Sequence, residues 1–174
     1  LSLSLEGDDR DEIRSVLENI ANNYVMKNIE RNAAEAEKSL QFLQSHLPDV
    51  RSSLEDSEQK LNNYRQKNDS VDLNLEAKAA LDTMVALETQ LNQLTFKESD
   101  ISQQFTKSHP AYISLMEKRH TLMKEKERIN QQVQKLPKVQ QDVLRLTRDV
   151  QVGQEIYLQL LNKVQELNIL KAGT

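Results

Sequence analysis

The sequence predicts a mainly α-helical protein, an elongated antiparallel hairpin or coiled-coil bundle of three or four long helices. Two stretches, residues 33–64 and 73–105, carry apolar residues in an unbroken three-four spacing. This spacing places a narrow apolar stripe along one side of a helix, as in helices that lie lengthwise against other helices. The chain has 4% aromatic residues, no Trp, three Gly and three Pro, which argues against a sheet-rich globule with tight turns.

The residues that we expect to form the helix seams are leucines at these spacings. They are Leu40, Leu43, Leu47, Leu54 and Leu61 in the first stretch, and Leu87, Leu91 and Leu94 in the second. Charged residues make up 29% of the chain and apolar residues 37%, which suits thin contacts between helices better than a thick central core. Stability should therefore come from the length of the seams.

At the start of the chain, residues 1–6 alternate between leucine and mostly serine. A period of two predicts a short, half-buried strand. No partner strand is evident in the sequence, so we expect the partner to lie outside the segment, in a base domain. Asp8 or Asp9 can cap the first helix, and Asp9 with Glu12 three residues later resembles a capping box, which predicts that the helix begins here.

We expect this helix to cover about residues 9–67, within an elongated helical domain of residues 7–172. Pro48 lies inside it, where proline removes a hydrogen-bond donor and clashes with the preceding turn. Because Leu47, Val50 and Leu54 keep the same phase on both sides, the sequence favours a kink over two unrelated helices. The polar residues from Asn68 to Asn74 predict a turn.

Three more helices are expected after this turn, at about residues 73–106, 110–136 and 138–170. Pro110 is well placed at the first position of the third helix. Pro137 resembles Pro48 in context and predicts either a kink beside that of Pro48 or a change of direction, so three or four passes are possible. Residues 173–174 would begin the return to the base domain.

Charge is unevenly distributed, although the net charge is only −4. Residues 1–100 hold 20 acidic and 11 basic residues, whereas residues 107–148 hold 4 acidic and 10 basic ones. The two blocks could attract each other across a hairpin or between subunits, or form an ordinary solvated surface. We hypothesise that the acidic first helix meets the basic third helix of a neighbouring subunit, through Lys118, Lys124 and Lys126.

The sequence offers no candidate for catalysis, cofactor binding or metal binding. It has no Cys, and His46, His109 and His120 lack metal-ligand spacing. The three glycines cannot form a phosphate-binding loop, and the basic residues near Lys118 alternate with acidic ones and lack stacking aromatics, so we expect no nucleic-acid partner. No apolar run approaches the length needed to cross a bilayer.

The last third of the chain carries a recognisable pattern. Residues 136–150 read LPKVQQDVLRLTRDV, residues 157–161 YLQLL and residues 169–174 ILKAGT. This resembles the signature of bacterial polysaccharide co-polymerases, in the class that is fused to a cytoplasmic tyrosine autokinase. LPDVR at residues 47–51 and SHP at 108–110 also match that class. The motif positions are filled by Pro137, Gln140, Arg148, Asp149, Tyr157, Leu160 and Leu161.

The resemblance implies the periplasmic part of an inner-membrane protein that governs polymerisation, chain length and export of exopolysaccharide such as colanic acid or capsule. It implies a homo-oligomeric ring, an octamer, next to the polymerase and export machinery and the nascent polysaccharide. Transmembrane helices would flank this region, and ATP and Mg²⁺ would belong to a kinase domain outside it. Arg148 and Asp149 would have a structural or intersubunit role, and Tyr157 would be a packed ring.

A second interpretation stays open at this point. The same helix pattern suits a structural coiled-coil hairpin of a secretion or efflux adaptor, or the spacer of an ATPase. The two interpretations differ in the domains that should flank the helices. Transmembrane segments with a strand pair favour the first, and a lipoyl-like or nucleotide-binding flank favours the second.

Overall fold

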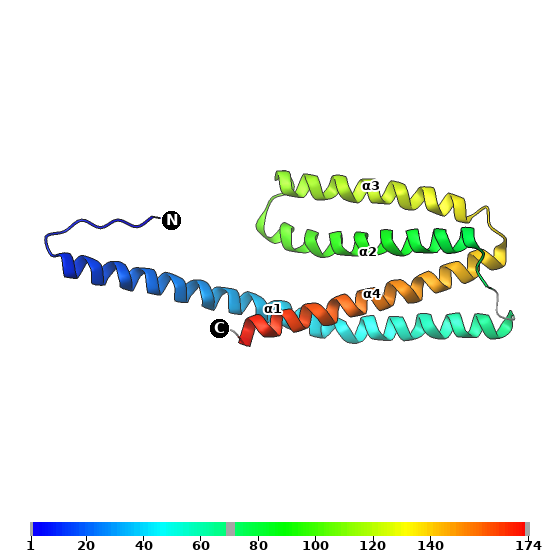
Figure 1. Ribbon diagram of the computed structural model, residues 1–174, viewed down its shortest axis with the longest axis horizontal. Coiled ribbons are helices and arrows are strands. Elements are labelled where there is room, and N and C mark those ends of the chain that lie inside the picture. Colours follow the sequence, from blue (N-terminus) through cyan, green and yellow to red (C-terminus); the bar gives the residue numbers. More distant parts are fainter. Residues whose placement is uncertain (1, 69–71, 173–174) are drawn as a thin grey trace. The chain divides into compact units, whose positions relative to one another are not determined.

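The computed structural model describes residues 2–68 and 72–172, and these residues form four helices (Figure 1). The helices are α1 (Arg10–Lys67), α2 (Leu75–Gln104), α3 (Pro110–Val133) and α4 (Lys138–Ala172). Within the described residues there is no strand. The predicted mainly α-helical class is confirmed.

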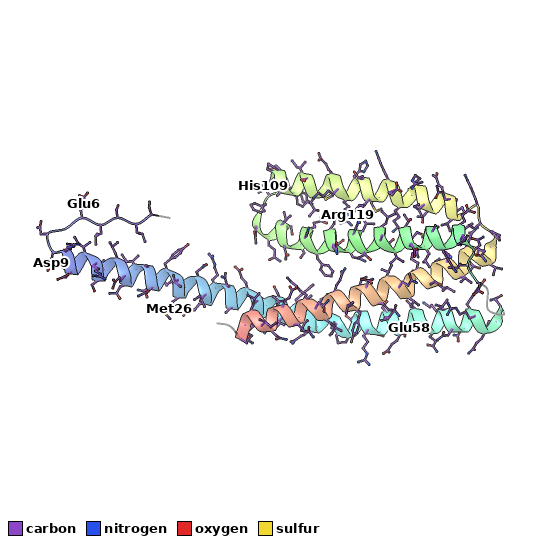
Figure 2. All side chains as sticks on the ribbon, viewed as in Figure 1. Glu6, Asp9, Met26, Glu58, His109 and Arg119 are labelled. Atoms are coloured by element: carbon purple, nitrogen blue, oxygen red, sulfur yellow. The ribbon has the colours of Figure 1, made fainter. Side chains whose placement is uncertain are left out.

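The N-terminal residues 2–7 have no regular secondary structure, and α1 follows a capping aspartate. Asp9, labelled in Figure 2, accepts hydrogen bonds through Oδ1 from the backbone N–H of Asp11 at 2.9 Å and of Glu12 at 3.3 Å. The predicted cap is thereby confirmed, because these N–H groups have no partner inside the helix. A strand requires a paired neighbour, so the expected pairing of residues 1–6 outside this segment stays a prediction.

Helix α1 passes through Pro48 without interruption. Pro48 has no N–H to offer to the carbonyl of Gln44, four residues earlier. In the preceding turn the Ser45 hydroxyl donates to the Phe42 carbonyl at 2.7 Å, and the His46 and Phe42 rings lie tilted to each other with centroids 4.1 Å apart. The chain therefore forms one helix here and not two.

The chain divides into two compact units, Leu1–His46 with Leu161–Thr174, and Leu47–Leu160. In the first unit, the end of α4 lies beside α1, since Lys171 Nζ is 3.1 Å from Glu37 Oε1. Leu40 and Leu43 of α1 and Leu167 of α4 are buried in this unit. It is a short antiparallel contact between two helices.

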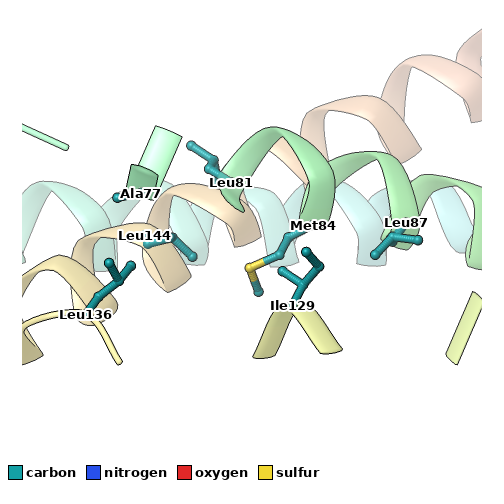
Figure 3. Packing of buried hydrophobic residues seen from close by; sticks show 7 residues of the cluster. All are labelled: Ala77, Leu81, Met84, Leu87, Ile129, Leu136 and Leu144. Atoms are coloured by element: carbon teal, nitrogen blue, oxygen red, sulfur yellow. The ribbon is translucent and has the colours of Figure 1, made fainter. Parts of the chain in front are cut away.

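The second unit contains the main hydrophobic core, where α2, α3 and α4 meet (Figure 3). Leu144 of α4 is fully buried at the centre of this region, and Ile129 of α3 is 4% exposed. The cluster consists of Ala77, Leu81, Met84, Leu87, Ile129, Leu136 and Leu144. Because it contains the first turns of α2 and α4 and the last turns of α3, it joins the three helices at one end of the α2–α3 pair.

Helices α2 and α3 form an antiparallel hairpin (Figure 1). Phe105 ends α2 in an extended conformation, with φ −131° and ψ 150°. His109 then caps α3 through Nδ1, which accepts from the Ala111 N–H at 3.1 Å, and Pro110 occupies the first turn as predicted. The hairpin therefore has a short loop, in which the side chain of His109 caps the start of α3.

Two of the helix ends that differ from the sequence prediction have a local reason. Helix α2 begins at Leu75 because the Asn74 side chain accepts from the Ala77 N–H at 2.8 Å. Helix α3 stops at Val133, followed by a turn in which the Leu136 N–H bonds to the Val133 carbonyl. Pro137 therefore lies at a break where the chain reverses, and its interpretation as a kink in a continuing helix is wrong.

Candidate functional site

The turn between α3 and α4 carries the first motif residue, Pro137. Here the side chain of Gln141 donates through Nε2 to the carbonyls of Leu136 at 2.7 Å and Gln134 at 3.1 Å. These carbonyls lie beyond the last hydrogen bonds of α3 and need donors from elsewhere. Pro137 itself precedes α4, and its carbonyl accepts from the Gln141 N–H at 3.0 Å. The turn is therefore fixed by the residues of the motif region.

Gln140 connects this turn to the start of α2. Its Nε2 donates to the carbonyl of Asp72 at 3.0 Å, and its Oε1 accepts from the N–H of Asn74 at 3.3 Å. Both groups belong to the backbone just before α2, where a helix has unsatisfied N–H groups. Gln140 thus ties two segments that are 66 or more residues apart in the sequence, which gives this motif residue a structural role.

A second link at this end joins α4 to α1 through Asp142. Its carboxylate accepts a long hydrogen bond of 3.4 Å from the Tyr64 hydroxyl and lies 3.0 Å from Lys138 Nζ and 3.4 Å from Arg145 Nη2. The Asp142 side chain is only 16% exposed. We did not single out Asp142 from the sequence, although its spacing to Lys138 and Arg145 is that of helical ion pairs.

The pKa values of Asp142 and Tyr64 are shifted in opposite directions. The hydrogen bond from Lys138 holds the pKa of Asp142 below its ordinary value, assisted by the charges of Lys138 and Arg145 and opposed by burial. Burial raises the pKa of Tyr64, and the nearby Asp142 carboxylate raises it further. At neutral pH the pair therefore consists of a neutral hydroxyl donor and an ionised acceptor.

The remaining motif residues lie farther along α4. Arg148 donates through Nη2 and Nε to Asp149 Oδ1, at 2.9 and 3.1 Å, so the ion pair joins neighbouring residues. Leu160 is 4% exposed, whereas Tyr157 and Leu161 are half-buried. The structure does not gather the motif residues into one pocket: Pro137 and Gln140 lie at the helix junction and the others follow α4.

The predicted seam leucines lie on two helices, α1 and α2. Leu61, Leu87, Leu91 and Leu94 are buried in the second unit, where Leu47 and Leu54 are half-buried. Leu54 lies against Gly153 of α4, close enough that an added Cβ on the glycine would be 3.1 Å from Leu54 Cδ1. Glycine lowers the stability of a helix interior, and the close approach of α1 explains why a glycine occupies this position of α4.

Opposite charges meet within the α2–α3 hairpin. Lys126 of α3 pairs with Glu88 of α2, and Arg119 Nη1 lies 2.9 Å from Glu98 Oε2. Tyr112 donates to the other oxygen of Glu98 at 3.2 Å, and burial, with this hydrogen bond, raises the pKa of its hydroxyl. Arg119 and His109, labelled in Figure 2, mark the hairpin.

These pairs modify the charge hypothesis drawn from the sequence. Part of the excess positive charge of residues 107–148 is neutralised by acidic residues of α2, because Lys126 pairs with Glu88 and Arg119 pairs with Glu98. Lys118 and Lys124 have no ion-pair partner among residues 2–68 and 72–172. Of the three lysines proposed for an intersubunit contact, Lys126 already has a partner in its own hairpin.

Residues 2–68 and 72–172 contain no group of three or more His, Cys, Asp or Glu that could hold a metal ion. Separately, none of the helices, as far as the structure describes them, has an apolar stretch of the length and purity that a membrane span requires.

Comparison with known proteins adds a family match at the end of the chain. Residues 138–174 match a family described as a G-rich domain on putative tyrosine kinase. The matched range starts with α4 and includes every motif residue except Pro137, which precedes it directly. The helix that carries the motif is therefore similar to a segment found on tyrosine kinases.

Relatives match the chain along its whole length. A putative tyrosine-protein kinase AmsA of Erwinia amylovora is 54% identical over 174 residues, or 100% of this chain and 24% of the relative. The tyrosine-protein kinase wzc of Salmonella typhimurium is 56% identical over the same share of both chains. The tyrosine-protein kinase etk of Escherichia coli is 55% identical over 173 residues, which are 99% of this chain and 24% of the relative.

The chain is thus an all-helical relative of one segment of bacterial tyrosine-protein kinases, and it spans about a quarter of their length. The similarity extends from the first residues to the last, far beyond the motif. The resemblance stated from the motif is confirmed, because the chain is similar over its whole length to one segment of the wzc and etk kinases.

Proposed function

We propose that this chain is the periplasmic helical module of an inner-membrane polysaccharide co-polymerase fused to a tyrosine autokinase. In this role it regulates the polymerisation, chain length and export of exopolysaccharide and performs no catalysis itself. The observation that carries the proposal is the similarity of the whole chain to one segment of wzc-type kinases, together with the family match over α4. Phosphoryl transfer would belong to the kinase domain of the parent protein.

The described contacts support a positioning role. Gln140 and Asp142 fix the junction of the helices, and the α2–α3 hairpin extends from it with its own ion pairs. A rigid scaffold of this kind suits a ring of identical subunits, in which one face of each subunit meets a different face of the next. The ring, an octamer in the resemblance, with the polymerase and export machinery beside it, is part of the proposal.

The experiment replaces the matching segment of the full-length Salmonella typhimurium relative by this chain, in cells that lack their own copy. We expect the chimera to restore an exopolysaccharide of normal length distribution, measured by gel filtration, and to assemble as a ring in detergent. A chimera with the same segment carrying Gln140→Ala serves as the matched variant. Restored kinase activity with no effect of the segment on polymer amount or length would overturn the proposal.

A further inference from the structure

One face of the α2–α3 hairpin is hollowed into an open groove of about 550 Å³. It lies entirely within the second unit. Gln90, Gln93 and Lys97 form one wall, at positions three and four apart along α2. The groove is distinct from the junction of Gln140 and Asp142, and its residues are not among the motif positions.

The opposite wall belongs to α3 and is also polar. It consists of Ser114, Glu117, Lys118 and Thr121, and all four residues are exposed. Apart from the Thr121 hydroxyl, which donates to the Glu117 carbonyl at 3.1 Å, these side chains make no hydrogen bond or ion pair within the described part of the chain. The side chains of Ser114, Glu117 and Lys118 and the acceptor capacity of the Thr121 oxygen are therefore available to a ligand.

The floor of the groove is apolar and continuous with the hairpin seam. Leu94 is 8% exposed and Leu122 is half-buried, so the two leucines separate the polar walls. Gln90 and Gln93 face this floor from α2 and likewise have no partner among the described residues. A ligand here would meet a narrow apolar strip between amides, hydroxyls and charged groups.

This chemistry narrows the class of ligand. An amphipathic helical partner lays its apolar face into a hydrophobic groove, and both walls of this groove are polar. Single-stranded nucleic acid would need aromatic stacking platforms, and no aromatic residue lines the groove. Small-molecule sites are enclosed and mostly apolar, unlike this open groove.

We propose that this groove binds an extended carbohydrate chain, whose hydroxyl groups meet the amides and hydroxyls of the walls and whose C–H faces lie on Leu94 and Leu122. The inference rests on the proposed function, because it identifies the growing or exported polymer as a direct ligand of this segment. Lys97 and Lys118 outnumber Glu117, so the groove accommodates acidic sugars as well as neutral ones.

The test titrates the ¹⁵N-labelled chain with oligosaccharides released from the exopolysaccharide of the cells used for the chimera. We expect saturable shifts of the side-chain amides of Gln90 and Gln93. The double variant Gln93→Ala/Thr121→Ala should bind about tenfold more weakly, since it lacks two hydrogen-bonding groups. The matched control Gln66→Ala/Lys67→Ala, on exposed positions of α1, should bind like the unmodified chain.

Two results would overturn the inference, namely no shift of the groove amides at millimolar oligosaccharide, or equal weakening by the control variant. Circular dichroism verifies that both variants keep their helices, and both change only exposed residues. The chimera decides the proposed function separately. If the chimera restores polymer length but the groove binds no oligosaccharide, the proposed function is supported and the groove inference is wrong. If the groove binds oligosaccharide but the chimera is inactive, the groove inference is supported and the proposed function is wrong.

Discussion

Gly153 of α4 lies directly against Leu54 of α1, where a Cβ on the glycine would be 3.1 Å from Leu54 Cδ1 and 3.7 Å from Leu54 Cα. The first contact is tighter than ordinary van der Waals distance, so an alanine here would require Leu54 to move. Replacing an interior helical glycine by alanine otherwise adds about 0.5–1 kcal/mol of stability. The two effects should nearly cancel in Gly153→Ala.

A double-mutant cycle separates these effects. In the Leu54→Ala background the clash is gone, so Gly153→Ala should stabilise the chain, with a coupling of at least about 0.5 kcal/mol between the positions. The free energy of unfolding in urea provides the measurement. As the control, Gly153→Ala in the background of Leu158→Ala, an exposed position, should show no coupling. Equal effects of Gly153→Ala in all three backgrounds would refute the close contact.

The core cluster gives a second prediction. Leu144 is 0% exposed and lies where α2, α3 and α4 meet. Leu144→Ala should lower the free energy of unfolding by about 2–5 kcal/mol, because it loses apolar burial and leaves a cavity. Leu158→Ala on the same helix should change it by less than about 0.5 kcal/mol. A small effect at Leu144 would mean that the three helices are not held by this cluster.

The Tyr64–Asp142 link predicts how stability varies with pH. The pKa of Asp142 is lowered from 3.8, so its contribution is complete above this value and is lost as the pH falls through the lower folded-state pKa. The pKa of Tyr64 is raised from 10.0, so its contribution is complete below 10.0 and is lost as the pH rises through the higher folded-state pKa.

Urea unfolding between pH 2 and 11 tests both limbs of this profile. Tyr64→Phe should reduce the alkaline loss, and Asp142→Asn should reduce the acid loss, relative to the unmodified chain. Tyr24→Phe, at an exposed tyrosine of α1, is the matched control and should leave the alkaline limb unchanged. If Tyr64→Phe alters neither limb, the hydroxyl does not bond to the carboxylate in solution.

The bond from Gln140 to the backbone before α2 predicts a local effect. Gln140→Ala removes the donor to the Asp72 carbonyl and the acceptor for the Asn74 N–H, and should cost about 1–2 kcal/mol. Amide exchange at Asn74 and in the first turn of α2 should accelerate more than in the rest of α2. Gln154→Ala, an exposed glutamine of α4, is the control. Uniform acceleration along α2 would argue against a local link.

The sequence predicted the helices well because their apolar spacing is a local property. The cap at Asp9 and the start at Pro110 were also predictable, since both depend on residues within one turn. Pro137 shows the limit of this reasoning. The apolar phase is the same before and after it, and only the turn formed by residues 134–136 shows that the chain reverses there.

The contacts between helices could not be predicted in the same way. A charge pattern identifies an exposed face of a helix but not its partner, so Lys126 looked available for a neighbouring subunit although it pairs with Glu88. Likewise, the motif identified Gln140 but did not show that its side chain bonds to the backbone of Asp72 and Asn74 before α2. Asp142 was missed because its importance comes from Tyr64, which is 78 residues away.

The hairpin of α2 and α3 is joined to its core at one end and closed at the other by a five-residue loop, residues 105–109. Matched insertions of seven residues in both helices, near the closed end, would repeat the seam without disturbing the junction. The length of the α2–α3 hairpin can therefore change during evolution while the core cluster at its base stays the same. Designed proteins with a longer or shorter hairpin can be built in the same way.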